Sequence, residues 1–212
     1  AGLDMGSMAS LGSNDAGSDI SAGRLAKRTH GAANLPQYAC TVWRDLPVPV
    51  LAAVHGVAYG GGLQIALGAE VRYVAADTRL SVMEIKWGLV PDMGGMLLTR
   101  GLVRPDHLRE LIYTGRIVNG EEACALGLAT HVVDDPRAAA LAAARDIARK
   151  SPDAIRAGKR LMRVVEDGDT PAILLAESVE QDRLIGTANQ REAVLAGMQN
   201  RAPVFQPAAK SE

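Results

Sequence analysis

A run of three glycines marks the first place where this chain can do chemistry. Residues 50–54 form a continuous apolar run that predicts a strand buried on both faces. Gly60, Gly61 and Gly62 follow, and residues 63–69 predict a short helix. The first N–H groups of a helix lack intrahelical acceptors, and glycines let a substrate approach the backbone closely. Such a turn can stabilise a substrate oxygen that gains negative charge, as a thioester oxygen does. The alternative is a tight turn that only packs a helix on a sheet.

Two carboxylates beyond the turn are candidates for proton transfer. Glu84 comes just after a predicted strand at 79–82, and Asp92 lies eight positions further on, within residues 88–95. Their mostly apolar surroundings would raise the pKa of a carboxyl group and suit it to acid–base work. Two structural alternatives stay open. Asp92 can cap the helix that follows it, and Glu84 can pair with Lys86 or Arg72.

Other reactive residue types show no pattern of a site. The histidines do not have metal-ligand spacing: His30, His55, His107 and His131. Ser81 and Cys124 lack the surroundings of an activated nucleophile. The helical spacing of Met93, Met96 and Leu97 indicates core or pocket lining.

Size and composition limit the function classes. With 212 residues, 48% of them hydrophobic, the chain can form one sizeable domain and a smaller part. The 23 basic and 24 acidic residues argue against nucleic-acid binding and offer no basic membrane patch. No apolar run has the length a bilayer needs, and residues 1–23 lack the features of a signal peptide. Two cysteines indicate a reducing compartment, so we expect a cytoplasmic protein.

The pattern of elements changes along the chain. Residues 5–34 are rich in Gly and Ser and predict a mobile loop, whereas residues 1–135 as a whole alternate strands and helices. Asn119 is the expected N-cap of a helix that Gly127 ends. Residues 136–212 predict helices only, two of them starting at a cap followed by proline, at 151–152 and 170–171. The fold class is therefore α/β, with a core at 1–135 and a helical region at 136–212.

Several motifs, in this order, resemble those of the crotonase (enoyl-CoA hydratase/isomerase) superfamily. Residues 49–62, Pro-Val-Leu-Ala-Ala-Val-His-Gly-Val-Ala-Tyr-Gly-Gly-Gly, are similar to its signature. Residues 1–4, Ala-Gly-Leu-Asp, resemble its upstream element, and residues 88–95 resemble its helix-entry loop. Residues 114–129 and 201–205 also fit, so the resemblance spans nearly the whole chain.

The resemblance implies a spiral of ββα units with C-terminal helices that build trimers, often paired into hexamers. It implies an acyl-CoA thioester substrate and no metal or redox cofactor, because CoA is part of the substrate. The backbone N–H groups of Leu3 and Gly61 would hold the thioester oxygen as an enolate forms. The implied substrate-contacting positions are Ala1, Gly60, Gln64 and Pro91.

The acidic positions decide which reaction the resemblance implies. Hydratases of the family use two glutamates; the second maps onto Glu84, but the first maps onto Gln64, whose amide cannot exchange a proton at neutral pH. Relatives that move a double bond use acids at the positions of Glu84 and, in some isomerases, Asp92. Double-bond isomerisation of an enoyl-CoA is therefore favoured. An enoyl-CoA hydratase, and a catalytically weak CoA-binding or assembly protein, are the alternatives.

Two departures from the family pattern stand out. Positions where the family often carries an aromatic residue and a lysine for a neighbour's CoA site are Gly197 and Asn200 here. Family members also have a substantial segment before the Ala-Gly-Leu-Asp element, so we expect an N-terminal truncation.

Overall fold

The computed structural model describes residues 25–208. The predicted positions Ala1 and Leu3, and most of the predicted loop at 5–34, lie outside this range. The described chain divides into two compact units, one of residues 25–45 and 50–140, the other of residues 46–49 and 141–208. This division falls inside a helix near residue 140, close to the predicted boundary at 135.

The first unit is built from strand pairs that alternate between two sheets. One sheet has the order β1-β3-β5, with β1 at Leu51–Val54, β3 at Val71–Val74 and β5 at His131–Val132, all parallel. The other pairs β2, Val57–Tyr59, in parallel with β4, Arg79–Ser81. Because β1 and β2 precede one helix and β3 and β4 precede the next, each ββ pair adds a strand to both sheets. This winding confirms the predicted α/β spiral of ββα units.

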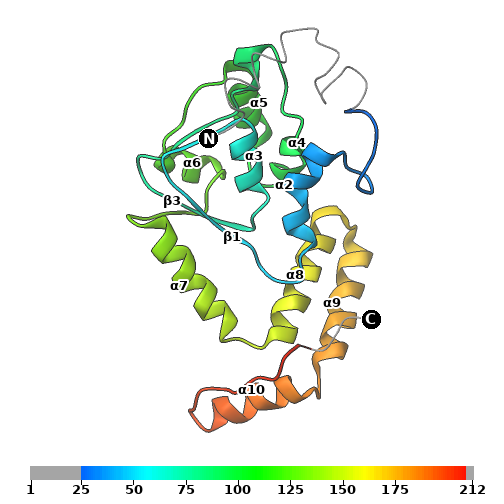
Figure 1. Cartoon of the computed structure of the whole chain (residues 1–212). Coiled ribbons are helices and arrows are strands. Elements are labelled where there is room, and N and C mark those ends of the chain that lie inside the picture. The colour runs from blue at the N-terminus through cyan, green and yellow to red at the C-terminus, as the bar shows by residue number, and fades with distance from the viewer. Residues whose placement is uncertain (1–24, 209–212) are drawn as a thin grey trace. The chain divides into compact units, whose positions relative to one another are not determined.

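Five α-helices and a short 3-10 helix complete the described part of this unit (Figure 1). They are α2 at Leu35–Asp45, α3 at Gly61–Leu67, η1 at Glu84–Trp87, α4 at Gly95–Leu98, α5 at Pro105–Thr114 and α6 at Gly120–Leu126. Local rules explain α6: the Asn119 side chain accepts a hydrogen bond from Glu122 N–H, and Gly127 ends the helix in the left-handed region. Both predictions for this helix are confirmed.

The core of the first unit lies between its helices and strands. Its largest fully buried apolar side chains are Leu63, Leu80, Leu111, Leu128, Val74 and Val118. The prediction that residues 50–54 are buried on both faces is wrong: Ala53 is exposed and the rest of β1 is half-buried. Within the described residues, β1 is an edge strand that pairs with β3 alone, so it is less covered than a central strand. Strand β2 was not predicted from the sequence, because its three residues are too few to show a period.

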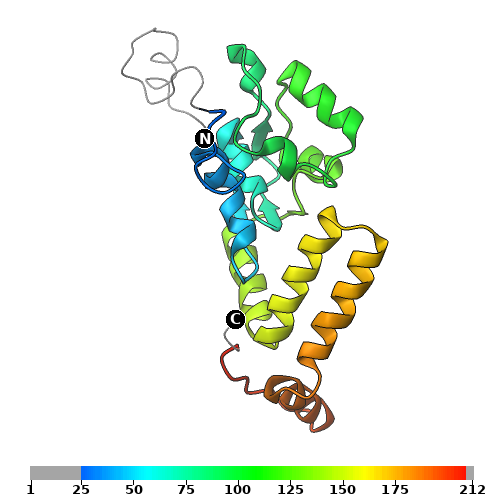
Figure 2. The same ribbon diagram turned by 90° about the vertical axis from the view of Figure 1, so that its right-hand side faces the viewer.

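The second unit is helical, as predicted. It contains most of α7, Pro136–Ala148, and then α8, Pro152–Asp167, α9, Thr170–Leu184, and α10, Ala188–Met198. Helices α8 and α9 run side by side (Figure 2). The buried Glu180 of α9 joins them, since it accepts hydrogen bonds from Arg160 of α8 at 2.9 Å and from Arg183 at 2.9 Å.

The helix starts of this unit follow capping rules with one correction. Ser151 caps α8 as predicted, through a hydrogen bond from Ala154 N–H. Helix α9 is capped by Asp169 instead of Thr170, because the Asp169 carboxylate accepts from Ala172 N–H. Asp169 precedes the predicted cap by one residue and leaves Pro171 in the first turn. In the described range, no helix combines the length and the apolar character needed to cross a bilayer.

Candidate active site

The glycine turn sits where β2 ends and α3 begins. Gly60 has φ +50°, a conformation that favours glycine, and its N–H donates to the Ser81 carbonyl at the end of β4 over 3.0 Å. A Cβ built on Gly60 would lie 3.4 Å from Glu84 Oε1. The absence of a side chain therefore lets the start of α3 lie directly against the Glu84 carboxylate.

Among residues 25–208, Glu84 is held by Gln64 and not by a cation. Gln64 is 4% exposed, and its Nε2 donates to Glu84 Oε1 at 2.6 Å. The predicted alternative partner Arg72 instead donates to the carbonyls of Leu128 and Ala69, at 2.8 and 2.6 Å. The Lys86 ammonium lies over the ring of Trp87. The ion-pair interpretation of Glu84 is thus replaced by a hydrogen bond between a carboxylate and an amide.

The second oxygen of Glu84 has a different environment. Oε2 is buried, and within residues 25–208 it has no hydrogen-bond partner. A buried acceptor without a partner is expensive in free energy, so such an atom in a folded protein needs an explanation. An oxygen of this kind can accept a proton from a substrate group that enters the site.

Gln64 also ties the helix-entry loop to α3. Its Oε1 accepts hydrogen bonds from the N–H groups of Met93 at 2.9 Å and Gly95 at 2.8 Å. The approach is close, because a Cβ on Gly95 would lie 2.7 Å from Gln64 Oε1 and a Cβ on Gly61 would lie 2.8 Å from Met93 Sδ. A side chain at Gly61 would therefore displace the end of Met93, and a side chain at Gly95 would displace the amide of Gln64.

These contacts border a pocket that is largely apolar. It is a shallow hollow of about 260 Å³, a volume that includes open space at its mouth, and it is lined by residues of α3, α4 and α5. Its lining consists of Gly60, Leu63, Gln64, Leu67, Val82, Glu84, Pro91, Gly95, Met96, Thr99, Leu108 and Ile112. The predicted site residues Gly60, Gln64, Glu84 and Pro91 thus come together here, and Met96 lines the pocket as its spacing indicated.

Seven lining residues were not named as site residues from the sequence: Leu63, Leu67, Val82, Gly95, Thr99, Leu108 and Ile112. Thr99 is buried, and its hydroxyl donates to the Gly95 carbonyl at 2.7 Å. Leu108 and Ile112 lie on α5, at a spacing that marks an apolar helix face. That spacing is the only signal they offer, and it is equally typical of core residues such as Leu111.

Asp92 is placed apart from this pocket. The residue is exposed and is not among the lining residues, whereas its neighbour Pro91 is. Partial desolvation of its carboxyl group raises the pKa of Asp92, as its apolar surroundings predicted. Burial of the Cys40 thiol and, secondarily, the nearby charge of Asp92 raise the pKa of Cys40 to about 11. Asp92 therefore lies near Cys40 of α2, and among residues 25–208 it does not line the pocket that contains Glu84.

The N-cap interpretation of Asp92 is wrong. The N-cap of α4 is Gly94, which lies in the left-handed region at φ +91° and has no side chain that could cap the helix. The hydrogen bonds from Met93 and Gly95 N–H to Gln64 set the path of this loop instead.

The remaining predicted groups are placed as follows. Gly61 is the first residue of α3, where N–H groups lack an intrahelical acceptor. Its proposed partner Leu3 and the position Ala1 belong to the part of the chain that is not described. Within residues 25–208, no three His, Cys, Asp or Glu side chains are grouped so as to hold a metal ion.

Several known proteins similar to this chain are named as hydratases or isomerases of CoA esters. The model of the family "Enoyl-CoA hydratase/isomerase" matches residues 16–208. The mitochondrial methylglutaconyl-CoA hydratase of Mus musculus is 32% identical over 167 residues, covering 76% of this chain and 53% of that protein. The enoyl-CoA isomerase/hydratase fer4 of Mycosarcoma maydis is 34% identical over 166 residues, covering 76% and 60%.

Solved structures agree with these relatives. The enoyl-CoA hydratase from Bacillus anthracis superposes with a TM-score of 0.77 at 29% identity, covering 80% of this chain and 67% of that one. The chain spans about half the length of the methylglutaconyl-CoA hydratases that it matches.

Proposed function

The chain belongs to the enoyl-CoA hydratase/isomerase family, and we propose that it moves a carbon–carbon double bond in an enoyl-CoA thioester. One observation carries this choice. The pocket places Glu84 against Gln64, so its described lining offers one carboxylate and one amide. An amide does not exchange protons at neutral pH, whereas a single carboxylate can take a proton and return it.

In the proposed reaction, Glu84 removes a proton from the carbon next to the thioester carbonyl of a 3-enoyl-CoA. The electron pair forms an enolate, whose oxygen is stabilised by Gly61 N–H and, by the family resemblance, Leu3 N–H. Glu84 then returns the proton to the γ carbon, and the double bond ends between the α and β carbons. No atom is gained or lost. We propose no metal or redox cofactor, because CoA enters as part of the substrate.

The lining of the pocket supports an apolar acyl chain. Leu63, Leu67, Met96, Leu108 and Ile112 contribute to it, and the described lining includes neither Lys nor Arg. The relatives named methylglutaconyl-CoA hydratases act, by that name, on an acyl group with a second carboxylate. Burying a carboxylate without a cation is costly, so we propose a hydrocarbon acyl chain as the substrate of this chain.

Water addition is the second candidate. It is favoured by the names of the relatives, several of which are hydratases. Hydration needs one group to activate water and one to protonate the α carbon. With Gln64 beside Glu84, the single carboxylate would have to perform both steps.

The decisive experiment offers purified protein a 3-enoyl-CoA and a 2-enoyl-CoA in separate reactions and follows the products by mass and chromatography. We expect a product of unchanged mass that elutes as the positional isomer. A mass gain of one water would favour the hydratase. No turnover of any acyl-CoA would leave the catalytically weak CoA-binding or assembly protein.

Two variants assign the acid. Glu84→Gln should lower turnover at least ~100-fold, the usual scale for a general acid–base group. Asp92→Asn should lower it less than about tenfold, because Asp92 does not line the pocket. The reverse order of effects would show that Asp92 carries the proton.

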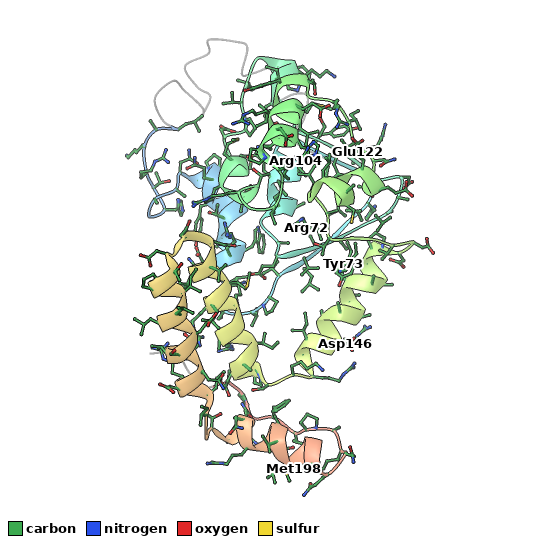
Figure 3. The ribbon with its side chains drawn as sticks, turned by 180° about the vertical axis from the view of Figure 1, so that it is seen from behind. Arg72, Tyr73, Arg104, Glu122, Asp146 and Met198 are labelled. Carbon is green, nitrogen blue, oxygen red and sulfur yellow. The ribbon has the colours of Figure 1, made fainter. Side chains whose placement is uncertain are left out.

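We also propose that the chain assembles with copies of itself, as a homotrimer or homohexamer. In support, helices α9 and α10 carry large apolar side chains that are more than half exposed, among them Leu174, Leu175 and Met198. Figure 3 labels Met198 near the end of α10. Light scattering during size-exclusion chromatography measures the assembled mass, and a monomer would refute this proposal.

A further inference from the structure

The amide of Gln64 can occupy its place in only one orientation. Its Oε1 accepts from two backbone N–H groups, those of Met93 and Gly95. A flipped amide would direct its NH₂ group at these two donors and its oxygen at the Glu84 carboxylate. Three contacts would become repulsive, so the backbone of the helix-entry loop fixes Nε2 towards Glu84.

This orientation distinguishes the two oxygens of Glu84. Oε1 accepts the hydrogen bond from Gln64 Nε2 at 2.6 Å, whereas Oε2 is buried and has no partner among the described residues. A proton shared with Oε1 would compete with the Gln64 donor, because a protonated oxygen is a poorer acceptor. Proton transfer is therefore easier at Oε2.

We propose that Gln64 is the positioning residue of this site: it holds Glu84 Oε1, leaves Oε2 as the atom that exchanges a proton with the substrate, and couples this geometry to the loop at Met93 and Gly95. The proposal rests on the proposed role of Glu84 in proton transfer. It adds to the expectation that Gln64 contacts the substrate.

Two substitutions separate the functions of this amide. Gln64→Glu keeps an oxygen for Met93 and Gly95 N–H but turns a second carboxylate oxygen towards Glu84. Gln64→Met has a similar size and removes both the donor and the acceptor. Ser81→Ala is the matched control, because it deletes another buried hydrogen bond, Ser81 Oγ to the Gly115 carbonyl at 2.8 Å, and leaves the contacts of Glu84 intact.

The first readout is the pH dependence of kcat/KM. In Gln64→Glu, two carboxylates at hydrogen-bond distance must share a proton, so the acidic limb should move to higher pH by about one unit or more. Gln64→Met should shift it in the same direction, since a buried carboxylate loses a donor. It should also raise KM, because the loop loses its anchor. Ser81→Ala should keep the wild-type profile even if its stability falls.

The second readout does not need activity. Carbon-13 NMR of the labelled glutamate carboxyl groups, with the Glu84 signal assigned by its loss in Glu84→Gln, gives the pKa of Glu84 directly. We expect a higher pKa in both Gln64 variants than in the wild type. If one variant fails to fold, as circular dichroism would show, the other provides the measurement.

The outcomes separate this proposal from the proposed function. Suppose that turnover needs Glu84, but that the pH profile and the NMR pKa are unchanged in both Gln64 variants. This result would overturn the positioning role alone. An NMR pKa that moves with Gln64 in a protein without turnover would support the positioning role and refute the isomerase.

Discussion

Gly95→Ala tests whether Gln64 really links the loop to α3. A Cβ at this position would lie 2.7 Å from Gln64 Oε1 and 3.0 Å from its Cδ and Cγ. These are distances that real Cβ atoms rarely show, and the nearest atom belongs to a side chain that can move. We therefore expect the Gln64 side chain to be displaced and its three hydrogen bonds, to Glu84, Met93 and Gly95, to break.

The size of the effect follows from these three bonds. At about 1 kcal/mol each, their loss destabilises the fold by about 3 kcal/mol. Alanine in a helix is favoured over glycine by about 1 kcal/mol, and Gly95 lies in α4. The net destabilisation should be about 2 kcal/mol. In a Gln64→Ala background the obstructing side chain is gone, so Gly95→Ala should be neutral or stabilising by up to about 1 kcal/mol.

Urea denaturation of the four proteins in this double-mutant cycle measures the coupling, which should be about 2 kcal/mol or more. Gly158→Ala is the control for helix propensity, since an added Cβ there meets open space inside α8 and should stabilise by about 1 kcal/mol. Equal effects of Gly95→Ala in both backgrounds would refute the reasoning, because they would mean that the methyl group does not act through Gln64.

Three further predictions concern other contacts. Gly61→Pro removes a proposed oxyanion donor at the first position of a helix, which tolerates proline. Turnover should therefore fall about 100-fold further than in Gly61→Ala, and equal turnover of the two folded variants would refute the donor role. Glu180→Gln should destabilise by about 1 kcal/mol at pH 7, reduced by solvent around the partly exposed Arg160. The hydrogen bond from Arg160 lowers the pKa of Glu180 below 4.5, so the stabilisation by the ionised carboxylate is lost as the pH falls below that value. The difference in unfolding free energy between wild type and Glu180→Gln, measured in urea, should therefore shrink at low pH, and a difference independent of pH would contradict the ion pair. Iodoacetamide at pH 8 should react with Cys124 and spare Cys40, because the Cys40 pKa of about 11 leaves about 0.1% of this thiol as thiolate. Peptide mass spectrometry locates the label, and modification of Cys40 in folded protein would contradict this prediction.

Features that depend on near neighbours in the sequence were predictable. Asn119 and Ser151 cap helices as their positions indicated, since a capping side chain reaches only three residues along the chain. Gly127 ends α6 in the left-handed region, as its position predicted. The family motifs allowed a prediction beyond such local features, because their order implied a spiral fold that helix and strand propensities alone do not specify.

Features that depend on distant contacts were not predictable in the same way. An N-cap was the structural alternative to a catalytic role for Asp92, because a polar residue before a helix is typical of one. The actual start of α4 is set by Gln64, which is 29 positions from Met93 and holds that residue's N–H. A local pattern contains no information about such a contact, so the sequence could name Pro91 and Asp92 together but not decide which of them lines the pocket.

Gln64 shows what the structure adds to a substitution that the sequence already identified. From the sequence, an amide in place of a glutamate only removes a proton carrier. In the structure, the same amide accepts two hydrogen bonds and donates one to Glu84. A carboxylate at position 64 could accept the first two hydrogen bonds, but it could form a hydrogen bond with Glu84 only if the two carboxylates shared a proton. With Gln64 as its neighbour, Glu84 does not have to share a proton with a second carboxylate, and one of its oxygens stays open. A carboxylate in that state is suited to begin a reaction by removing a proton, which is the first step of double-bond migration.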